Sequence, residues 1–219
     1  MVDPAVARVH RLLSDCYGIP NPRPRQQLLD VLVETILSQN TSDTNSRRAF
    51  LNLKRRYPDW DSARRAGPRA IAGAIRSGGL SHIKSRRIHR ILSQLGRSNQ
   101  GLSLQHLSRL SREDAYRSLM AMEGVGPKTA ACTLLFGAGT PVFPVDTHIH
   151  RVSLRLGWAR EGEKREGFQE RFRREVPDDI IYPLHVNLIE HGRRVCRPRG
   201  PVCESCCLAE ICQQGRSKS

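Results

Sequence analysis

The residues best suited to metal chemistry are four cysteines near the end of the chain. With six, two and five residues between them, they are Cys196, Cys203, Cys206 and Cys212. An intracellular chain, which we expect here, does not use disulfides by default, so four clustered thiols indicate a metal site. Structural zinc sites usually contain two close cysteine pairs, and here only Cys203 and Cys206 form one. The wide, uneven spacing favours a 4Fe–4S cubane over zinc. Cys16 and Cys132 fall outside the pattern and are expected to be small core residues.

A second kind of chemistry needs an amine that can lose its proton. Arginine keeps its charge, so such an amine must belong to one of the five lysines: Lys54, Lys84, Lys128, Lys164 and Lys218. Lys128 follows Pro127, which is tolerated in the first turn of a helix. The positive end of a helix dipole disfavours a cation there, and a neutral amine can attack a sugar C1′ to form a Schiff base.

Two features beside this lysine could complete a site. Gly124-Val125-Gly126 joins two short predicted helices and leaves backbone amides at the start of the second one, where a phosphate could bind. Asp146 lies 18 residues after Lys128, beyond a Gly/Pro-rich loop that could fold back toward it. Asp146 is also expected to be the N-cap of its own helix.

The charge of the chain indicates what such a site would act on. The 219 residues carry 36 basic and 21 acidic side chains, a formal net charge of +15. Between Arg47 and Arg97 there are fourteen Lys or Arg residues and only two acids, Asp59 and Asp61. This balance argues against an ordinary small-metabolite enzyme and indicates a nucleic-acid partner.

The hydrophobic pattern predicts an all-α fold without a convincing strand. Leu28, Leu32 and Ile36 repeat at the spacing of a helix that is buried on one side. Ser111 and Asp114 form a capping box. The predicted helices span 27–38, 49–57, 71–75, 85–95, 115–122 and 128–136, with another beginning after Asp146. The longest uncharged stretch, 129–145, is interrupted by Gly and Pro, so no membrane span is expected.

The cysteine spacing, together with segment 122–130 (MEGVGPKTA) and segment 145–148 (VDTH), resembles the endonuclease III family of DNA glycosylases. These belong to the helix–hairpin–helix superfamily with a Gly/Pro-rich loop and a catalytic Asp. The likeness runs from about residue 25 to 212. It implies a 4Fe–4S cluster on the four cysteines, Lys128 as nucleophile and Asp146 as its acid–base and electrostatic partner.

The resemblance also implies residues that contact DNA. Family members fill the gap left by an extruded base with side chains from loops, and the matching positions here are Gln39 and Leu80. Without the resemblance, Gln39 would be interpreted as an ordinary polar residue at a helix end and Leu80 as an ordinary core leucine. His148 is expected to contact a phosphate or to face solvent. The predicted DNA-contacting set is Gln39, Leu80, Gly124, Val125, Gly126, Thr129 and His148.

Two acids depart from the pattern or complicate it. Glu123 stands where family members commonly have proline. Glu34 resembles the glutamate with which adenine-mismatch glycosylases protonate adenine, although those enzymes lack the lysine. A monofunctional mismatch glycosylase and a non-catalytic DNA-binding protein therefore stay open beside a bifunctional glycosylase/AP lyase that excises oxidised pyrimidines.

The expected architecture has two helical lobes with a DNA-binding groove between them. One lobe covers 20–140 and includes the hairpin, and the other joins 1–19 to 141–219 and carries the cluster. The polar first residues show no secretory signal. We expect a monomer in the cytoplasm of a prokaryote, associated with the nucleoid, whose partner is damaged double-stranded DNA and not a membrane.

Overall fold

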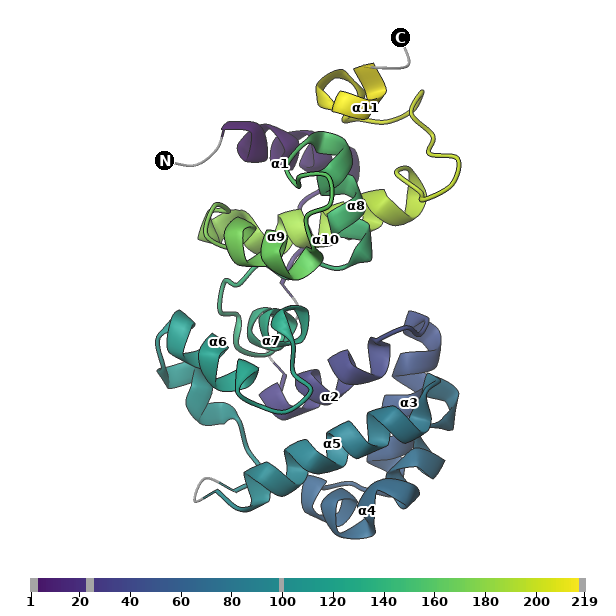
Figure 1. The fold of residues 1–219 in the computed structure, drawn as a ribbon, viewed down its shortest axis with the longest axis vertical. Coiled ribbons are helices and arrows are strands. Elements are labelled where there is room, and N and C mark those ends of the chain that lie inside the picture. Colours follow the sequence, from purple (N-terminus) through teal and green to yellow (C-terminus); the bar gives the residue numbers. More distant parts are fainter. Residues whose placement is uncertain (1–3, 23–25, 99–100, 217–219) are drawn as a thin grey trace. The chain divides into compact units, whose positions relative to one another are not determined.

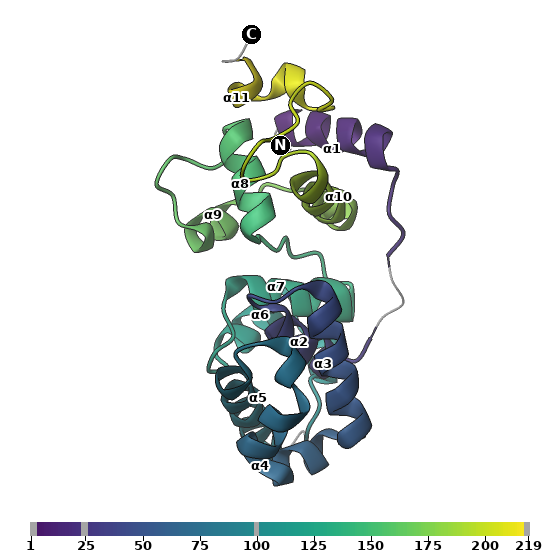
Figure 2. The same cartoon turned by 90° about the vertical axis from the view of Figure 1, so that its right-hand side faces the viewer.

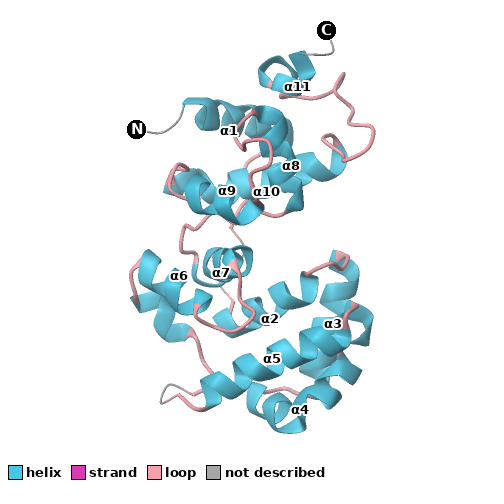
Figure 3. Cartoon of the chain, in the orientation of Figure 1, coloured by secondary structure: helices cyan, strands magenta, loops and turns pink. Residues whose placement is uncertain are grey.

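Helices follow one another along the chain in the computed structural model, which describes residues 4–22, 26–98 and 101–216. Among these residues there is no strand, and the connections are loops and turns (Figure 3). The predicted all-α fold is confirmed. The chain divides into two compact units, one of Arg25–Thr140 and one that joins Met1–Pro24 to Pro141–Ser219.

The unit of residues 25–140 holds six α-helices and three short helical segments among its described residues (Figure 1). They are α2 (Leu28–Ser38), α3 (Asp43–Arg56), α4 (Trp60–Ala74), η1 (Arg76–Gly78), α5 (Ser81–Gly96), η2 (Gln105–Arg109), α6 (Arg112–Met120), α7 (Pro127–Thr133) and the π-helical η3 (Leu134–Ala138).

Helix α2 forms the centre of this unit. It packs against α3, α5, α7 and η3. Leu28, Leu32 and Ile36 are buried as their spacing predicts, but Val31 and Leu37 on other sides are buried as well. The buried surface of α2 is therefore wider than the one side predicted, because seven of its eleven residues are apolar; Asp30, Glu34 and Ser38 form the less buried stripe.

Helix α4 is much longer than the predicted 71–75 segment. Asp59 Oδ1 accepts a hydrogen bond from the Ser62 amide at 2.7 Å and caps its start. The helix kinks at Gly67, whose φ is +80°, and continues from Pro68. A Gly-Pro pair normally ends a helix, but the proline here sits in the first turn after the kink, where its missing N–H costs nothing. Helix α4 packs along α5 (Figure 2).

The second unit is built around α10. Its elements are α1 (Pro4–Tyr17), α8 (Thr147–Leu156), α9 (Arg165–Phe172), η4 (Asp178–Ile180), α10 (Ile181–Arg194), η5 (Ala209–Ile211) and α11 (Gln213–Arg216). Helix α10 packs against α1 and α8. Phe143, Phe168 and Phe172 form the aromatic part of the core, with ring centroids 4.9–5.2 Å apart along the Phe168–Phe172–Phe143 chain. No helix in the described part of the chain is long and apolar enough to cross a membrane.

Candidate functional site

The hairpin of the first unit runs from α6 through residues 121–126 into α7. Ser111 caps α6 by accepting from the Asp114 amide at 3.1 Å, as the capping box predicts. Gly126 is the N-cap of α7 and Pro127 its first residue, so half-buried Lys128 is the second residue of the helix. The Val125 amide donates to Met122 O at 3.0 Å and the Val125 side chain is buried. Val125 therefore shapes the turn, and its amide is already used within it.

Gly124 has to be glycine for two reasons. Its φ of +84° is a conformation that other residues rarely adopt. A Cβ added there would also lie 2.6–2.7 Å from three atoms of the Arg87 side chain. The hairpin thus leaves room for an arginine of α5 to lie against its backbone.

Arg87 connects the hairpin to the end of α2. Its Nη1 donates to Gln39 Oε1 at 2.6 Å, and Gln39 Nε2 donates to Thr129 Oγ1 at 3.1 Å. Thr129 is buried and follows Lys128 directly in α7. Of the residues predicted to contact DNA, Gln39, Gly124 and Thr129 are thus joined through Arg87, beside the predicted nucleophile.

Leu80 lies at the tip of the turn between η1 and α5. Its side chain is 52% exposed, so the interpretation of a core leucine is wrong. Its φ of +47° is left-handed, an uncommon conformation for a leucine. A large apolar side chain held outward in a strained turn suits insertion into another molecule.

The other lysines are poorly placed for nucleophilic attack or lie elsewhere. Burial lowers the pKa of Lys84, but only 2% of this residue is exposed and three acceptors surround its ammonium. Lys54 pairs with Asp30 at 3.5 Å and lies over the Trp60 ring. Lys164 is exposed in the second unit, and Lys218 lies outside the described residues.

Asp146 belongs to the second unit and caps α8. Its Oδ1 accepts from the Ile149 amide at 2.8 Å, which confirms the predicted N-cap. Two buried side chains hold the segment that leads to it. Gln169 Oε1 accepts from the Val145 amide at 2.9 Å, and His185 Nδ1 lies 3.1 Å from Pro144 O. Asp146 is half-buried, and the cap uses only one of its two carboxylate oxygens.

His148 is fixed by an arginine one turn further along α8. Arg151 Nη2 lies 3.1 Å from His148 Nδ1 and 2.7 Å from Gly192 O, and Arg151 Nε donates to Cys196 O at 2.9 Å. Because arginine can only donate, His148 Nδ1 must accept and Nε2 carries the ring proton of the neutral histidine. Arg151 thereby connects the start of α8 to the loop with the first of the four cysteines.

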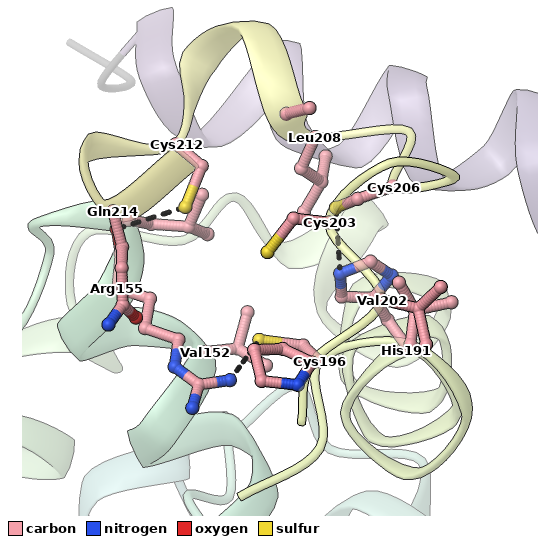
Figure 4. Close-up of a pocket in the computed structure, with 14 residues that line it drawn as sticks. Val152, Arg155, His191, Cys196, Val202, Cys203, Cys206, Leu208, Cys212 and Gln214 are labelled. Atoms are coloured by element: carbon pink, nitrogen blue, oxygen red, sulfur yellow. Dashed lines mark hydrogen bonds between the residues drawn. The ribbon is translucent and has the colours of Figure 1, made fainter. Parts of the chain in front are cut away.

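The four cysteines line one cavity, as predicted from their spacing. Cys196, Cys203, Cys206 and Cys212 line a partly open pocket and surround its centre (Figure 4). Apolar residues of α8 and of the C-terminal loop make up much of the remaining wall, Val152, Leu156 and Leu208 among them. Two side chains approach the sulfurs: Arg155 Nη1 lies 3.1 Å from Cys196 Sγ, and His191 Nε2 lies 3.6 Å from Cys206 Sγ.

The seven cysteines of the chain differ in where the structure places them. In the described part of the chain, no three His, Cys, Asp or Glu side chains are placed so that they could hold a single metal ion. The four thiols line one shared cavity. Cys207 is absent from the cavity wall, and Cys132 is buried as predicted. Cys16 is exposed, so its assignment to the core is wrong. It is the last residue but one of α1, and its position on that helix faces solvent and not the core.

Comparison with known proteins agrees with this geometry. Residues 33–178 match the family described as HhH-GPD superfamily base excision DNA repair protein. Endonuclease III of Thermotoga maritima is 33% identical over 84% of this chain and 81% of its own length. The chain belongs to the HhH-GPD superfamily, within its endonuclease III family.

Two further comparisons extend this result. A protein of Arabidopsis thaliana named as a DNA glycosylase is 37% identical over 85% of this chain, which spans 61% of that relative's length. The solved structure of a trapped endonuclease III–DNA covalent intermediate covers 97% of this chain with a TM-score of 0.82 at 24% identity, which shows a shared fold. The family match over 33–178 includes Lys128 and Asp146 and ends before the first of the four cysteines.

The two acids singled out in the sequence lie in different surroundings, Glu123 in the hairpin turn and Glu34 in a helix. Glu123 forms an ion pair with Arg90 of α5, which fastens the hairpin to that helix. Glu34 is half-buried on α2, five residues before Gln39.

The basic stretch between Arg47 and Arg97 has mixed roles. Lys84 is buried, Arg64 and Arg65 pair with Asp61, and Arg90 pairs with Glu123. Most of the remaining arginines are exposed, including Arg86. Arg86 and Arg87 are neighbours in this stretch but differ in their contacts: Arg87 donates to Gln39, a predicted site residue, whereas Arg86 donates to the backbone of His82.

Replacing Arg86 with alanine should therefore weaken binding to undamaged duplex and reduce the salt slope by about one. Relative excision rates for different lesions should stay unchanged. Arg87→Ala should also slow excision, because Gln39 loses the donor that holds its amide. Fluorescence anisotropy across a salt series, combined with single-turnover excision, measures both effects. If Arg86→Ala and Arg87→Ala had the same excision rates, the separate role given to Arg87 would be contradicted.

Proposed function

We propose that this protein excises oxidised pyrimidines from double-stranded DNA and then cleaves the strand at the abasic site by β-elimination. The arrangement of the first unit carries this proposal. Lys128 follows the glycine hairpin directly, and its neighbour Thr129 is hydrogen-bonded to Gln39. The proposed nucleophile, the turn proposed to bind phosphate and the side chain proposed to fill the gap thus all belong to one compact unit.

Lys128 would act as the nucleophile. Its amine attacks C1′ of the damaged nucleotide, and the C1′–N bond breaks as the base leaves with the bonding pair. The C1′–O4′ bond then breaks, O4′ takes up the proton that the lysine nitrogen gives up, and C1′ becomes the carbon of a protonated Schiff base. This iminium acidifies the C2′ proton, and removal of that proton expels the 3′ phosphate. Arginine cannot perform the first step because it stays protonated.

Asp146 would assist this chemistry from the start of α8. Its carboxylate can accept a proton from the Lys128 ammonium and can stabilise the positive charge that develops on the sugar. The buried side chains of Gln169 and His185 hold the backbone before Asp146 in place. One carboxylate oxygen can keep its cap hydrogen bond to the Ile149 amide while the other acts.

Gln39 and Leu80 would open the duplex. A base must leave the stack before its glycosidic bond can be attacked, and the emptied space has to be filled. Leu80 offers an exposed apolar side chain, and Gln39 offers an amide next to the hairpin. Gly124, Gly126 and the Nε2 of His148 would contact phosphates.

The four cysteines would hold a 4Fe–4S cluster. Such a cluster takes four thiolates, and the cavity brings together the four thiols that the spacing selects. Donors on Arg155 and His191 lie near two of the sulfurs and could stabilise them as thiolates. Bound there, the cluster would brace the loop of 196–212. The exposed Arg197 and Arg199 of this loop, and Arg193 and Arg194 at the end of α10, are candidates for phosphate contacts.

The purified protein should therefore contain iron and absorb broadly near about 400 nm. Cys203→Ser should give insoluble protein or protein that binds DNA weakly, because the metal organises a loop with little core of its own. Metal analysis and gel filtration measure this, and Cys16→Ser, at an exposed thiol outside the cavity, is the matched control. About one zinc per chain without iron would contradict the cluster assignment.

A panel of duplexes tests the proposed reaction. It contains an oxidised pyrimidine, a mismatched adenine, a mismatched thymine and an abasic site, each with and without borohydride. The expected result is release of the oxidised base, strand cleavage and a trapped protein–DNA complex. A protein that only binds DNA would leave every strand intact.

A monofunctional mismatch glycosylase is the second candidate. Glu34 is placed on α2 near Gln39, and a solved thermostable thymine-DNA glycosylase shares the fold with a TM-score of 0.77 at 18% identity. Release of mismatched adenine or thymine without a trapped complex would favour this candidate. A lysine at position 128 can form a Schiff base with the sugar, which favours the bifunctional enzyme.

A further inference from the structure

Lys84 is a buried cation without a carboxylate partner among the contacts that the structure shows. It lies in the first turn of α5 and is 2% exposed. Its Nζ donates to Leu37 O at 2.6 Å, to Gly78 O at 2.7 Å and to Thr41 Oγ1 at 2.7 Å. Three acceptors around one nitrogen match the three protons of an ammonium group.

These acceptors belong to two separate loops. Leu37 and Thr41 flank the turn that carries Gln39, and Gly78 begins the turn that carries Leu80. The Thr41 hydroxyl lies 2.5 Å from Gly78 O, which gives a second link between the loops. The backbone amide of Lys84 also donates to Leu80 O at 3.0 Å. One residue thus holds the Leu80 turn through both its main chain and its side chain.

Both loops contain backbone strain. Among the described residues, the non-glycine residues with positive φ are Asn40 at +52° and Leu80 at +47°. One lies next to Gln39, and the other is the exposed leucine. Such conformations persist only where the surroundings enforce them, and they cluster at functional sites. The Lys84 ammonium is the group that the two strained turns share.

We propose that Lys84 is a positioning residue that joins the Gln39 turn and the Leu80 turn into one preorganised surface for the opened base stack. This rests on the proposed function, in which these two side chains enter the DNA. Without the ammonium, Leu37 O loses its side-chain donor, and the hydrogen bond from the Thr41 hydroxyl to Gly78 O remains as the side-chain link between the two turns that the described residues show. Inserting both side chains would then require ordering of the loops at the moment of binding, which slows base extrusion.

The test compares one oxidised pyrimidine in two settings under single-turnover conditions. In one duplex the lesion is paired with a purine, and in the other it faces an abasic-site analogue, where little has to be unpaired. Lys84→Met should slow release of the paired lesion by about ten- to a hundredfold, because the three hydrogen bonds of the charged ammonium no longer order the two turns before binding. Release of the unpaired lesion should change far less. Lys164→Met, at an exposed lysine of the other unit, controls for lost charge.

Thr41 supplies a second, milder pair of variants. Thr41→Val removes the hydroxyl that links Lys84 to Gly78, and Thr41→Ser restores it, so only valine should show the paired-lesion defect. Hydrogen exchange should also rise at 38–41 and 77–80 in Lys84→Met and Thr41→Val. Equal slowing of both substrates, or no slowing in either series, would overturn the role of Lys84. Failure of the wild type to release the lesion from either duplex would instead overturn the proposed function.

Discussion

Lys128→Gln is expected to abolish both borohydride-trapped DNA and β-elimination, while binding to lesion duplex persists. The amide cannot form an imine with C1′, so no reducible intermediate exists. The hairpin backbone and the Gln39–Thr129 hydrogen bond do not involve the Lys128 side chain. Trapping gels measure the first effect, and anisotropy with undamaged and lesion duplexes measures the second.

Lys128→Arg separates charge from nucleophilicity in the same experiment. Arginine keeps the positive charge beside the hairpin but stays protonated. The Lys128→Arg variant should therefore bind DNA normally and give no borohydride-trapped complex. Lys54, Lys84 and Lys164 should each be dispensable for formation of the covalent bond. Lys54 is paired with Asp30, Lys84 is buried, and Lys164 belongs to the other unit. A trapped complex in Lys128→Gln would place the nucleophile on another residue.

Asp146→Asn is expected to slow base release by about 10²–10⁴ with little effect on folding. The amide cannot accept the lysine proton and carries no negative charge to stabilise the sugar cation. Asparagine is as good an N-cap as aspartate, so α8 should keep its first turn. Single-turnover excision gives the rate, and thermal unfolding gives the stability.

Asp146→Ser and Asp146→Ala distinguish the carboxylate from the cap. Serine caps α8 but has no carboxylate, so it should be as slow as asparagine and nearly as stable. Alanine should be equally slow and also less stable by about 1 kcal/mol, because the Ile149 amide loses its acceptor. Near-wild-type excision in Asp146→Ser would show that Asp146 serves only as a cap.

Local chemistry explains why some of the structure follows from the sequence. The caps at Ser111 and Asp146 depend on residues three positions apart, and the structure contains both. The cysteine spacing brings four thiols to one cavity because the loop between them is short. The full length of α4 is harder to predict, because a Gly-Pro pair can mark either the end of a helix or a kink inside it.

The missed residues act across long distances in the sequence. Arg87 reaches Gln39, 48 positions away, and Lys84 reaches Leu37, 47 positions away. Both residues look like ordinary members of a basic stretch. Arg151 and Arg155 look like solvated charges on α8, yet they hold the backbone or sulfur of Cys196. Gly124 is the sequence signal for the Arg87 contact, because a glycine lets another group approach the backbone closely.

The covalent attachment site tests the central claim most directly. The wild-type protein is incubated with an oxidised-pyrimidine duplex and borohydride, digested with protease and nuclease, and mapped by mass spectrometry. The account predicts a reduced sugar adduct on the peptide with Lys128, at Nζ. An adduct on any other residue, or excision of the base without an adduct, would contradict it.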